Sequence, residues 1–269
     1  MEGDKLFAGS IPELYERYLV PLIFEPYAQD LAARLLARSP ARVLELAAGT
    51  GVVTRAMART LPGSTGIVAT DLNVPMIDHA RAVGTERPVE WHQADALSLP
   101  FTDASFDAVV CQFGVMFFPD KPAAFAEARR VLRPGGTLFF NVWDRIEDNE
   151  FADTVTRALG EVFPADPPRF LARTPHGYWD EPTLRRDLAS GGFTARAEVI
   201  ILPARSLASS FRDPAIAYCQ GTPLRNEIEA RGAQALALAT DAAAEAVAAR
   251  FGRGAVEGKI QALVVRASA

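Results

Sequence analysis

The sequence has few of the residues that disulfide-stapled, metal-binding or nucleic-acid-binding proteins need. It holds two cysteines, Cys111 and Cys219, which provide neither a disulfide framework nor a CxxC metal motif. Only three lysines occur, the arginines are scattered and the net charge is -5, so no basic face for nucleic acid is expected. No cluster has metal-ligand spacing, and no Gly-x-Ser-x-Gly or Cys/His nucleophile pattern is found, so neither a metal nor those nucleophiles are predicted.

Long apolar runs are also missing. No stretch approaches the length of a membrane helix, and Glu2, Asp4 and Lys5 leave no signal-peptide core at the N-terminus. Apolar residues make up 49% of the chain, and 269 residues suit one α/β domain with an elaborated cap better than two independent domains. These features predict a soluble, cytoplasmic protein without membrane insertion.

The most informative segment is an apolar strand that ends in a glycine turn. Residues 43–51 (Val-Leu-Glu-Leu-Ala-Ala-Gly-Thr-Gly) combine a strand with a tight turn, and residues 52–61 read as a helix. This is where an α/β sheet receives a nucleotide-like ligand, and glycine permits close approach and positive φ there. A second apolar strand, 66–70, ends in Asp71, which is placed to accept hydrogen bonds from a ribose diol.

Three more predicted strands follow, each beside a short motif. They are 89–93 with Ala94-Asp95-Ala96-Leu97, 108–112 with Phe113-Gly114-Val115, and 137–142 with Leu132-Arg133-Pro134-Gly135-Gly136. In this order the motifs resemble the class I S-adenosylmethionine (SAM) methyltransferases. Within them they are most similar to the small-molecule branch (methyltransferase type 11) that includes the ubiquinone/menaquinone C-methyltransferases. The resemblance covers about residues 40–145, and it departs at Ala47 and Ala48, where many relatives have a glycine.

The resemblance implies a Rossmann-like, seven-stranded α/β sheet flanked by helices, with strand order 3-2-1-4-5-7-6 and the last strand antiparallel. Residues 1–39 are then an N-terminal helical lid, and 40–269 the methyltransferase domain. Cap segments are expected at 145–190 and 205–257. The second is an insertion between the last two strands. It is predicted to form two alanine-rich helices with a break near Arg231-Gly232, and a homodimer face is its alternative role.

The predicted lid has its own helix signals. Ser10 followed by Glu13 is typical of a capping box and predicts a helix through Leu19. Pro21 is expected to interrupt it, and a second helix is predicted over 24–38.

The resemblance also implies a cofactor site, with SAM as the cofactor and S-adenosylhomocysteine as the product. The first turn holds the amino-acid end of SAM, Asp71 the ribose, and Leu72 the adenine face. Asp95 accepts from the adenine amino group, and the backbone of Ala96 donates nearby. The complete predicted set is Tyr18, Glu45, Ala47, Gly49, Thr50, Gly51, Asp71, Leu72, Met76, Asp95, Ala96, Leu97, Gln112 and Phe113.

The reaction implied is methyl transfer by in-line displacement to a small, largely apolar metabolite, at oxygen, nitrogen or carbon. The protein must then align the reactants and exclude water, and a general base is needed only if the acceptor keeps its proton. His176, in a polar-aromatic loop, is the candidate catalytic base. The predicted substrate-binding residues are Tyr15, Phe117, Trp143 and Tyr178, and Asn141 and Asp144 are also placed to line this pocket.

Two other classes of function remain open at this stage. An NAD(P)-dependent oxidoreductase would share the glycine turn and Asp71, but its fingerprint needs a third glycine where Thr54 stands. A non-catalytic SAM-binding protein would keep every motif and lack only the reaction, because fold does not imply function.

Overall fold

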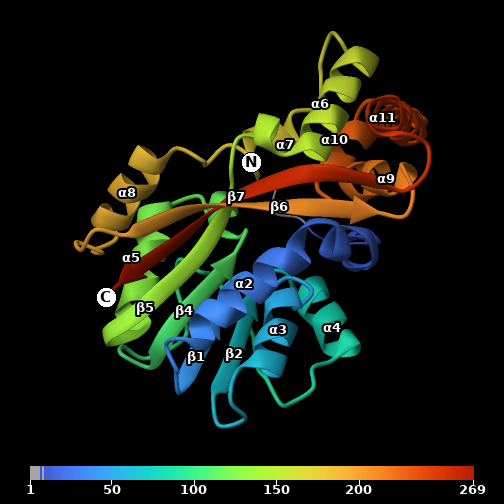
Figure 1. Cartoon of the computed structure of the whole chain (residues 1–269). Coiled ribbons are helices and arrows are strands. Elements are labelled where there is room, and N and C mark those ends of the chain that lie inside the picture. The colour runs from blue at the N-terminus through green and yellow to red at the C-terminus, as the bar shows by residue number, and fades with distance from the viewer. Residues whose placement is uncertain (1–6, 8) are drawn as a thin grey trace. The chain divides into compact units, whose positions relative to one another are not determined.

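The computed structural model describes Phe7 and residues 9–269 (Figure 1). The expectation about a signal peptide concerns residues 1–6, which lie outside the described part. Seven strands form one sheet in the order β3-β2-β1-β4-β5-β7-β6, which confirms the predicted topology. The strands are β1 (Arg42–Glu45), β2 (Gly66–Asp71), β3 (Glu90–Gln93), β4 (Phe106–Gln112), β5 (Leu132–Trp143), β6 (Glu198–Ala208) and β7 (Val256–Ser268).

The first five strands are parallel and the last is not. β1 pairs in parallel with β2 and β4, β2 with β3, and β4 with β5. The Ala269 N–H, just beyond β7, donates to the Gly136 carbonyl near the start of β5 at 2.9 Å, and the Asp144 N–H just beyond β5 donates to the Gln261 carbonyl in β7 at 3.1 Å. β7 therefore runs antiparallel to β5, as predicted. The parallel pairing also brings the carboxyl ends of β1, β2, β4 and β5 to one edge of the sheet.

The chain divides into two compact units, a sheet unit and a helical unit. The sheet unit comprises Glu25–Val142, Tyr178–Leu202 and Ala262–Ala269. The helical unit comprises the residues up to Phe24, Trp143–Gly177 and Pro203–Gln261. Helix α2 (Glu25–Leu36) belongs to the sheet unit because Leu31 and Leu35 are part of its core. Of the predicted lid, only the residues up to Phe24 fall in the helical unit, and the lid and cap roles stay predictions.

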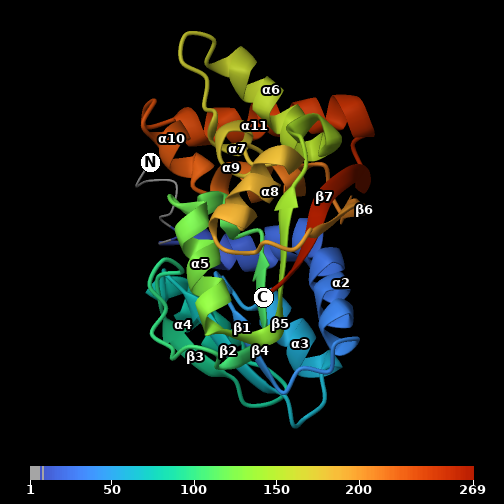
Figure 2. The same ribbon diagram turned by 90° about the vertical axis from the view of Figure 1, so that its left-hand side faces the viewer.

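Helices cover both faces of the strands in the sheet unit. They are α2, α3 (Val52–Thr60), α4 (Val74–Val83), η3 (Val115–Phe117), α5 (Lys121–Val131) and α8 (Glu181–Ser190). Helices α2 and α3 lie on one side and α5 on the other (Figure 2). Successive strand residues face opposite sides, so Phe139 joins the α2–α3 core while the Phe140 ring meets Phe125 of α5 at 5.3 Å. Burial on both faces explains the continuous apolar runs of these strands.

Arg130 of α5 holds the segment Leu99-Pro100-Phe101, which resembles the Leu-Pro-Phe motif of the family. Its guanidinium donates to the carbonyls of Leu99 and Phe101 at 3.0 and 2.7 Å, and Glu127 accepts from the Leu99 N–H at 2.8 Å. The motif is therefore a loop held against α5 by hydrogen bonds to its backbone.

The helical unit is built around α11 (Ala235–Phe251), which packs against α6 (Glu150–Val162) and α9 (Arg212–Gln220). Its other elements are α1 (Ile11–Leu14), η2 (Tyr15–Phe24), η4 (Ile146–Asp148), α7 (Phe170–Arg173) and α10 (Leu224–Glu229). Ala243 and Ala244 are buried, and small side chains of this kind let neighbouring helices approach closely. Within the described residues, no helix has the length and apolar character needed to span a membrane.

The N-terminal helices differ from the prediction in two ways. Pro21 does not interrupt them, because residues Tyr15–Phe24 form a π-helix that contains it. A π-helical turn shifts the hydrogen-bond register, which relieves the need for the N–H that proline lacks. The predicted capping box is also wrong at Ser10, whose hydroxyl makes no cap hydrogen bond and instead accepts from Arg225 at 2.6 Å.

The insertion between β6 and β7 contains three helices, α9, α10 and α11, where two were predicted. The predicted break near Arg231 is present, but a further break follows α9. A Cβ on Gly221 would lie 2.7 Å from the Ala217 carbonyl oxygen, so the close backbone approach that ends α9 requires glycine. Pro223 follows two residues later and directly precedes α10.

The core of the helical unit gives a stability prediction. Phe151 is fully buried, its ring meets Phe251 at 4.9 Å, and its ring carbons would lie 3.2 Å from a Cβ on Gly258. Phe151→Ala should lower the free energy of unfolding by about 3–5 kcal/mol, measured by urea denaturation. The control is Arg34→Ala, which removes a partly exposed i,i+4 ion pair with Asp30 on α2 and should cost below about 1 kcal/mol. Equal losses in the two variants would contradict this packing.

Candidate active site

Every second residue in the turn after β1 has a left-handed backbone conformation. Ala47, Gly49 and Gly51 have φ values of 52, 59 and 86°. Ala47 fits because its methyl group is small: a Cβ built on Gly114, after β4, would lie 2.6 Å from the Ala47 Cβ. The turn and the end of β4 are therefore in contact through two positions that admit no larger side chain.

Glu45 ends β1 and is almost fully buried. The Thr54 hydroxyl of α3 donates to its Oε2 at 2.5 Å, and the Thr70 hydroxyl donates to its backbone carbonyl at 2.8 Å. Burial raises the pKa of Glu45 to about 8, against the opposing effect of the Thr54 hydrogen bond. The carboxyl group thus holds its proton at pH 7, and a nearby cation would favour its ionised form.

Asp71 holds two turns together. Its Oδ2 accepts from the Gly49 N–H at 2.8 Å, and its Oδ1 accepts from the Asn73 N–H at 2.8 Å. Burial raises the pKa of Asp71, and the backbone hydrogen bonds from Asn73 and Gly49 oppose that shift. The predicted ribose acid is therefore also the brace between the β1 turn and the start of α4.

The predicted adenine residues follow β2 and β3. Leu72 is 45% exposed, so its side chain offers an apolar surface after β2. Met76 is buried, and its Cε lies 3.5 Å from the position of a Cβ on Gly49. Asp95 uses Oδ1 to accept from the Leu97 N–H at 2.9 Å, which fixes the local turn. Ala96, which lies between Asp95 and Leu97 in the sequence, is buried.

The end of β4 adds Gln112 and Phe113. Gln112 lies opposite Asn141 in the β4–β5 ladder. Phe113 is left-handed with φ of 50°, and its N–H donates to both the backbone carbonyl and the side-chain Oδ1 of Asn141, at 3.1 and 3.0 Å. Phe117 lies just beyond in η3. All the predicted cofactor residues except Tyr18 belong to the sheet unit and lie at or just after the carboxyl ends of its strands.

This edge of the sheet fits a ligand with an amino-acid end. The buried Thr50 hydroxyl has no hydrogen-bond partner in the part of the chain that the structure describes. Buried polar atoms are normally satisfied, so such an atom indicates a missing partner. Gly49 leaves its neighbourhood open, with Met76 the one contact within 4 Å of a built Cβ. Glu45 adds a buried carboxyl suited to an ammonium group.

The helical unit gathers four aromatic rings in a row, and three of them were predicted site residues. Tyr15 stacks on Phe24 with centroids 5.0 Å apart, Phe24 meets Trp143 at 6.1 Å, and Trp143 meets His176 at 6.0 Å. Phe24 was not predicted, because nothing in the sequence distinguishes it from a core residue. Phe24, Trp143 and His176 are buried and Tyr15 is partly exposed, so most of the row lies in the interior of this unit.

His176 is buried at the end of that row. Its Nδ1 lies 2.9 Å from the Asp144 carbonyl oxygen, so the tautomer that satisfies the carbonyl carries its proton on Nδ1. Burial lowers the pKa of His176 to about 4. The ring is therefore neutral at pH 7 and is a weak base.

Two other predicted residues have local partners. Arg17 lies over the Tyr18 ring at 5.1 Å in the helical unit. In the sheet unit, the Tyr178 hydroxyl donates to Asp187 at 2.8 Å and Lys121 lies over its ring at 4.7 Å. Their ligand-binding roles stay predictions, as does that of Phe117.

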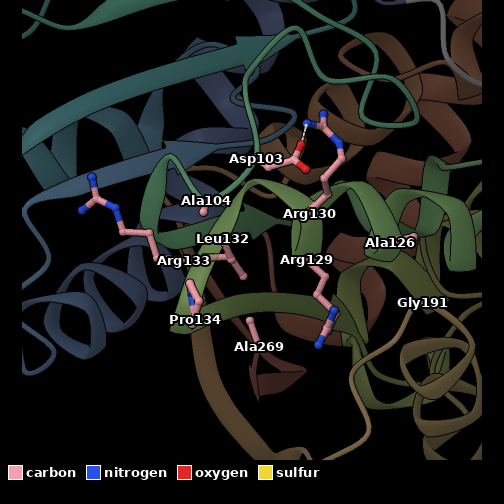
Figure 3. A pocket seen from close by; sticks show the side chains of 10 residues that line it. All are labelled: Asp103, Ala104, Ala126, Arg129, Arg130, Leu132, Arg133, Pro134, Gly191 and Ala269. Carbon is pink, nitrogen blue, oxygen red and sulfur yellow. Dashed lines mark hydrogen bonds and ion pairs between the residues drawn. The ribbon is translucent and has the colours of Figure 1, made fainter.

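A pocket of about 560 Å³ lies elsewhere in the sheet unit, near the start of β5 (Figure 3). Its three arginines point in different directions, and Arg130 pairs with Asp103 at 2.8 Å. Arg133 pairs with Asp107 at 2.6 Å. Because these cations do not converge, the pocket is not a built anion site. Over the described residues, no group of three His, Cys, Asp or Glu side chains is arranged to hold a metal ion.

The sequence interpretation missed Thr54, Thr70 and Asn73 as parts of the site. Thr54 was read only as a missing glycine, yet it is fully buried on the inner face of α3. A polar residue on an otherwise apolar helix face was the available signal, because such a group needs a buried partner.

Comparisons with known proteins identify the family of the chain. The model of the family described as "Methyltransferase domain" matches residues 44–140. A demethylmenaquinone methyltransferase of Deinococcus radiodurans is 39% identical over 50% of this chain, which spans just over half (57%) of that relative. A ubiquinone/menaquinone biosynthesis C-methyltransferase of Pseudomonas aeruginosa is 31% identical over 71% of this chain and 75% of its own length.

The fold has counterparts among solved structures. The crystal structure of a SAM-dependent methyltransferase from Thermotoga maritima superposes with a TM-score of 0.54, 17% identity and 95% coverage of both chains. Together the strand order, the site and the relatives define a class I SAM-dependent methyltransferase, and the chain belongs to that family. The relatives that it matches within the family are named as demethylmenaquinone and ubiquinone/menaquinone C-methyltransferases.

The glycine turn gives a second prediction. Gly51 has a φ of 86°, and a Cβ there would lie 3.0 Å from the Trp91 ring and 3.3 Å from Ala80. Gly51→Ala should therefore lower the free energy of unfolding by about 1–2 kcal/mol, in addition to any effect on ligand binding. Gly63→Ala is the matched control, because a Cβ at Gly63 meets nothing within 4 Å. Urea denaturation compares the two, and equal stabilities would show that the turn tolerates a side chain.

Proposed function

We propose that this protein transfers a methyl group from SAM to a ring carbon of a small, largely apolar quinol-like acceptor. The observation that carries the proposal is the buried Glu45–Thr54 pair beside the Asp71 brace. It offers one carboxyl group for an ammonium and a second one for a ribose at adjacent strand ends. The carbon acceptor and the quinol class rest on the relatives, whose names state these activities.

Different residues at the carboxyl edge of the sheet would bind different parts of SAM. Glu45 and Thr50 would hold the amino-acid end, Asp71 the ribose, and Leu72, Met76 and the Asp95 turn the adenine. SAM, when bound, would supply an electrophilic methyl group; the acceptor's electron pair would form the new bond to carbon, the carbon–sulfur pair would stay on sulfur, and the acceptor would release one proton. S-adenosylhomocysteine is then the product.

This chain's own residues bind, orient and exclude water. Gln112 and Phe113 end β4 and would face the reacting centre. Tyr15, the partly exposed ring of the aromatic row, would offer apolar surface to the acceptor. Alanine-rich α11 is covered within its own unit by α6 and α9. That covering favours a cap over a homodimer face. His176 is neutral and weakly basic, which suits a wall or a hydrogen-bonding group better than a strong general base.

Two alternative functions predict different ligands. An NAD(P)-dependent oxidoreductase needs glycine where Thr54 stands, and here the Thr54 hydroxyl is engaged with Glu45, so a pyrophosphate-binding turn is not favoured. A non-catalytic SAM-binding protein would bind the cofactor equally well. Only the transfer reaction separates it from the enzyme.

The proposal is tested by binding and turnover together. Calorimetry should detect SAM and S-adenosylhomocysteine binding and no NAD binding, and labelled SAM should methylate a reduced, short-chain prenyl naphthoquinol. Asp71→Ala should weaken SAM binding by about 1–3 kcal/mol through loss of charged hydrogen bonds. Asp78→Ala, an exposed acid of α4 paired with Arg81, should bind as the parent does. SAM binding with no methyl transfer to any acceptor would favour the non-catalytic reading, and NAD binding would overturn the assignment.

The buried carboxyl of Glu45 gives a pH prediction. Its pKa of about 8 in the free protein should fall when an ammonium binds beside it, so binding releases a proton and strengthens as pH rises. We expect the ratio of SAM affinities, parent over Glu45→Gln, to increase between pH 6 and pH 8 by up to about tenfold per pH unit. Any titration of SAM itself cancels in this ratio. A ratio that is flat with pH would show that Glu45 is already ionised or does not meet the ammonium.

A further inference from the structure

The side chain of Asn141 is held in one orientation at the end of β5. It is fully buried, and its Oδ1 accepts from the Phe113 N–H at 3.0 Å. An amide drawn the other way would point an N–H group at the Phe113 N–H, so the hydrogen bond fixes which end is oxygen. The Nδ2 group must therefore point away from Phe113.

That Nδ2 group has no acceptor in the part of the chain that the structure describes. Leaving a buried N–H donor unpaired costs about 1–3 kcal/mol, and native proteins keep few such groups. Asn141 also lies directly opposite Gln112 in the ladder, at the strand ends where the proposed reaction takes place. An acceptor atom on a bound ligand would satisfy it.

The chemistry of an amide donor restricts what that ligand atom is. A neutral N–H group cannot remove a proton, and a hydrogen bond to the attacking atom itself would withdraw the electron pair that must form the new bond. A donor helps when it binds an oxygen beside the attacking carbon. There it stabilises the ionised oxygen of an enol or phenol and increases the fraction of acceptor that is ready to react.

We propose that Asn141 is a specificity-determining residue that selects acceptors with an enolic or phenolic oxygen next to the methylated carbon, a role that rests on the proposed function. The acceptor's hydroxyl loses its proton to solvent, and its oxygen accepts from Asn141 Nδ2. As the ring carbon forms its bond to the methyl group, a lone pair of the oxygen becomes the second bond of a carbonyl group. Loss of the hydrogen on that carbon as a proton then returns the electron pair to oxygen and restores the ring.

The test compares Asn141→Leu with the parent on a reduced prenyl naphthoquinol. Leucine is close in size, and the Phe113 N–H keeps its second bond to the backbone carbonyl of residue 141. We expect kcat/KM for the quinol to fall about 10–100-fold, the loss expected for a hydrogen bond to a charged group. The acidic limb of its pH profile should move to higher pH, because the acceptor then ionises less readily. The dissociation constant of SAM should change less than about threefold.

Two further variants make the result decisive. Asn141→Asp keeps an acceptor for the Phe113 N–H and removes the donor, so at pH 8 it should also lose quinol turnover while binding SAM. Thr156→Val removes another unpartnered buried hydroxyl, on α6 in the helical unit, and should leave turnover unchanged. An unshifted pH profile, or a loss of SAM affinity equal to the loss of turnover, would overturn the role of Asn141. A parent that binds SAM but methylates no acceptor would instead refute the proposed function.

Discussion

The site depends on the burial of one carboxyl group at the end of β1. Glu45 sits where β1, β2 and β4 run parallel, and parallel pairing puts their carboxyl ends at a single edge. Inside the sheet a charged carboxylate is costly, so the group keeps its proton and receives a hydrogen bond from Thr54. The same burial that makes Glu45 unfavourable as an isolated anion makes it a strong partner for a cation. A cation bound beside Glu45 would therefore favour the ionised form of a carboxyl group that is neutral in the free protein.

The backbone of the turn after β1 links buried Glu45 to the carboxyl ends of β2, β4 and β5. The turn after β1 must return to α3 while leaving its backbone open, which requires left-handed residues at 47, 49 and 51. Asp71 fixes the middle of that turn through the Gly49 N–H. Contact between Ala47 and Gly114 then sets the distance to β4, and Asn141 holds Phe113 in its own left-handed conformation. Four strand ends are therefore linked by short contacts, and a change at one of them alters the others.

The sequence predicted the parts of this site that local pattern determines. The glycine turn and the strand-end acid Asp71 follow from apolar runs that end in turn residues. The strand order follows from the family resemblance, and the structure agrees with it. Features that depend on tertiary partners were not predictable. Pro21 looked like a helix end because local rules ignore a shift to π-helical hydrogen bonding. Ser10 looked like a cap, but Arg225 from a distant segment binds its hydroxyl. Thr54 looked like a missing glycine until its buried partner was known.

The two units carry different kinds of chemistry, and this difference bears on the acceptor. The sheet unit supplies buried carboxyl groups, a hydroxyl and an amide, which are the groups that recognise a cationic amino acid and a sugar. The helical unit supplies a row of rings and a neutral histidine, which recognise shape and apolar surface. At the strand ends of the sheet unit, Asn141 would supply a hydrogen-bond donor without supplying a base. Methyl transfer to a carbon beside an ionised oxygen needs that combination, because the acceptor brings its own nucleophile once its hydroxyl has lost a proton.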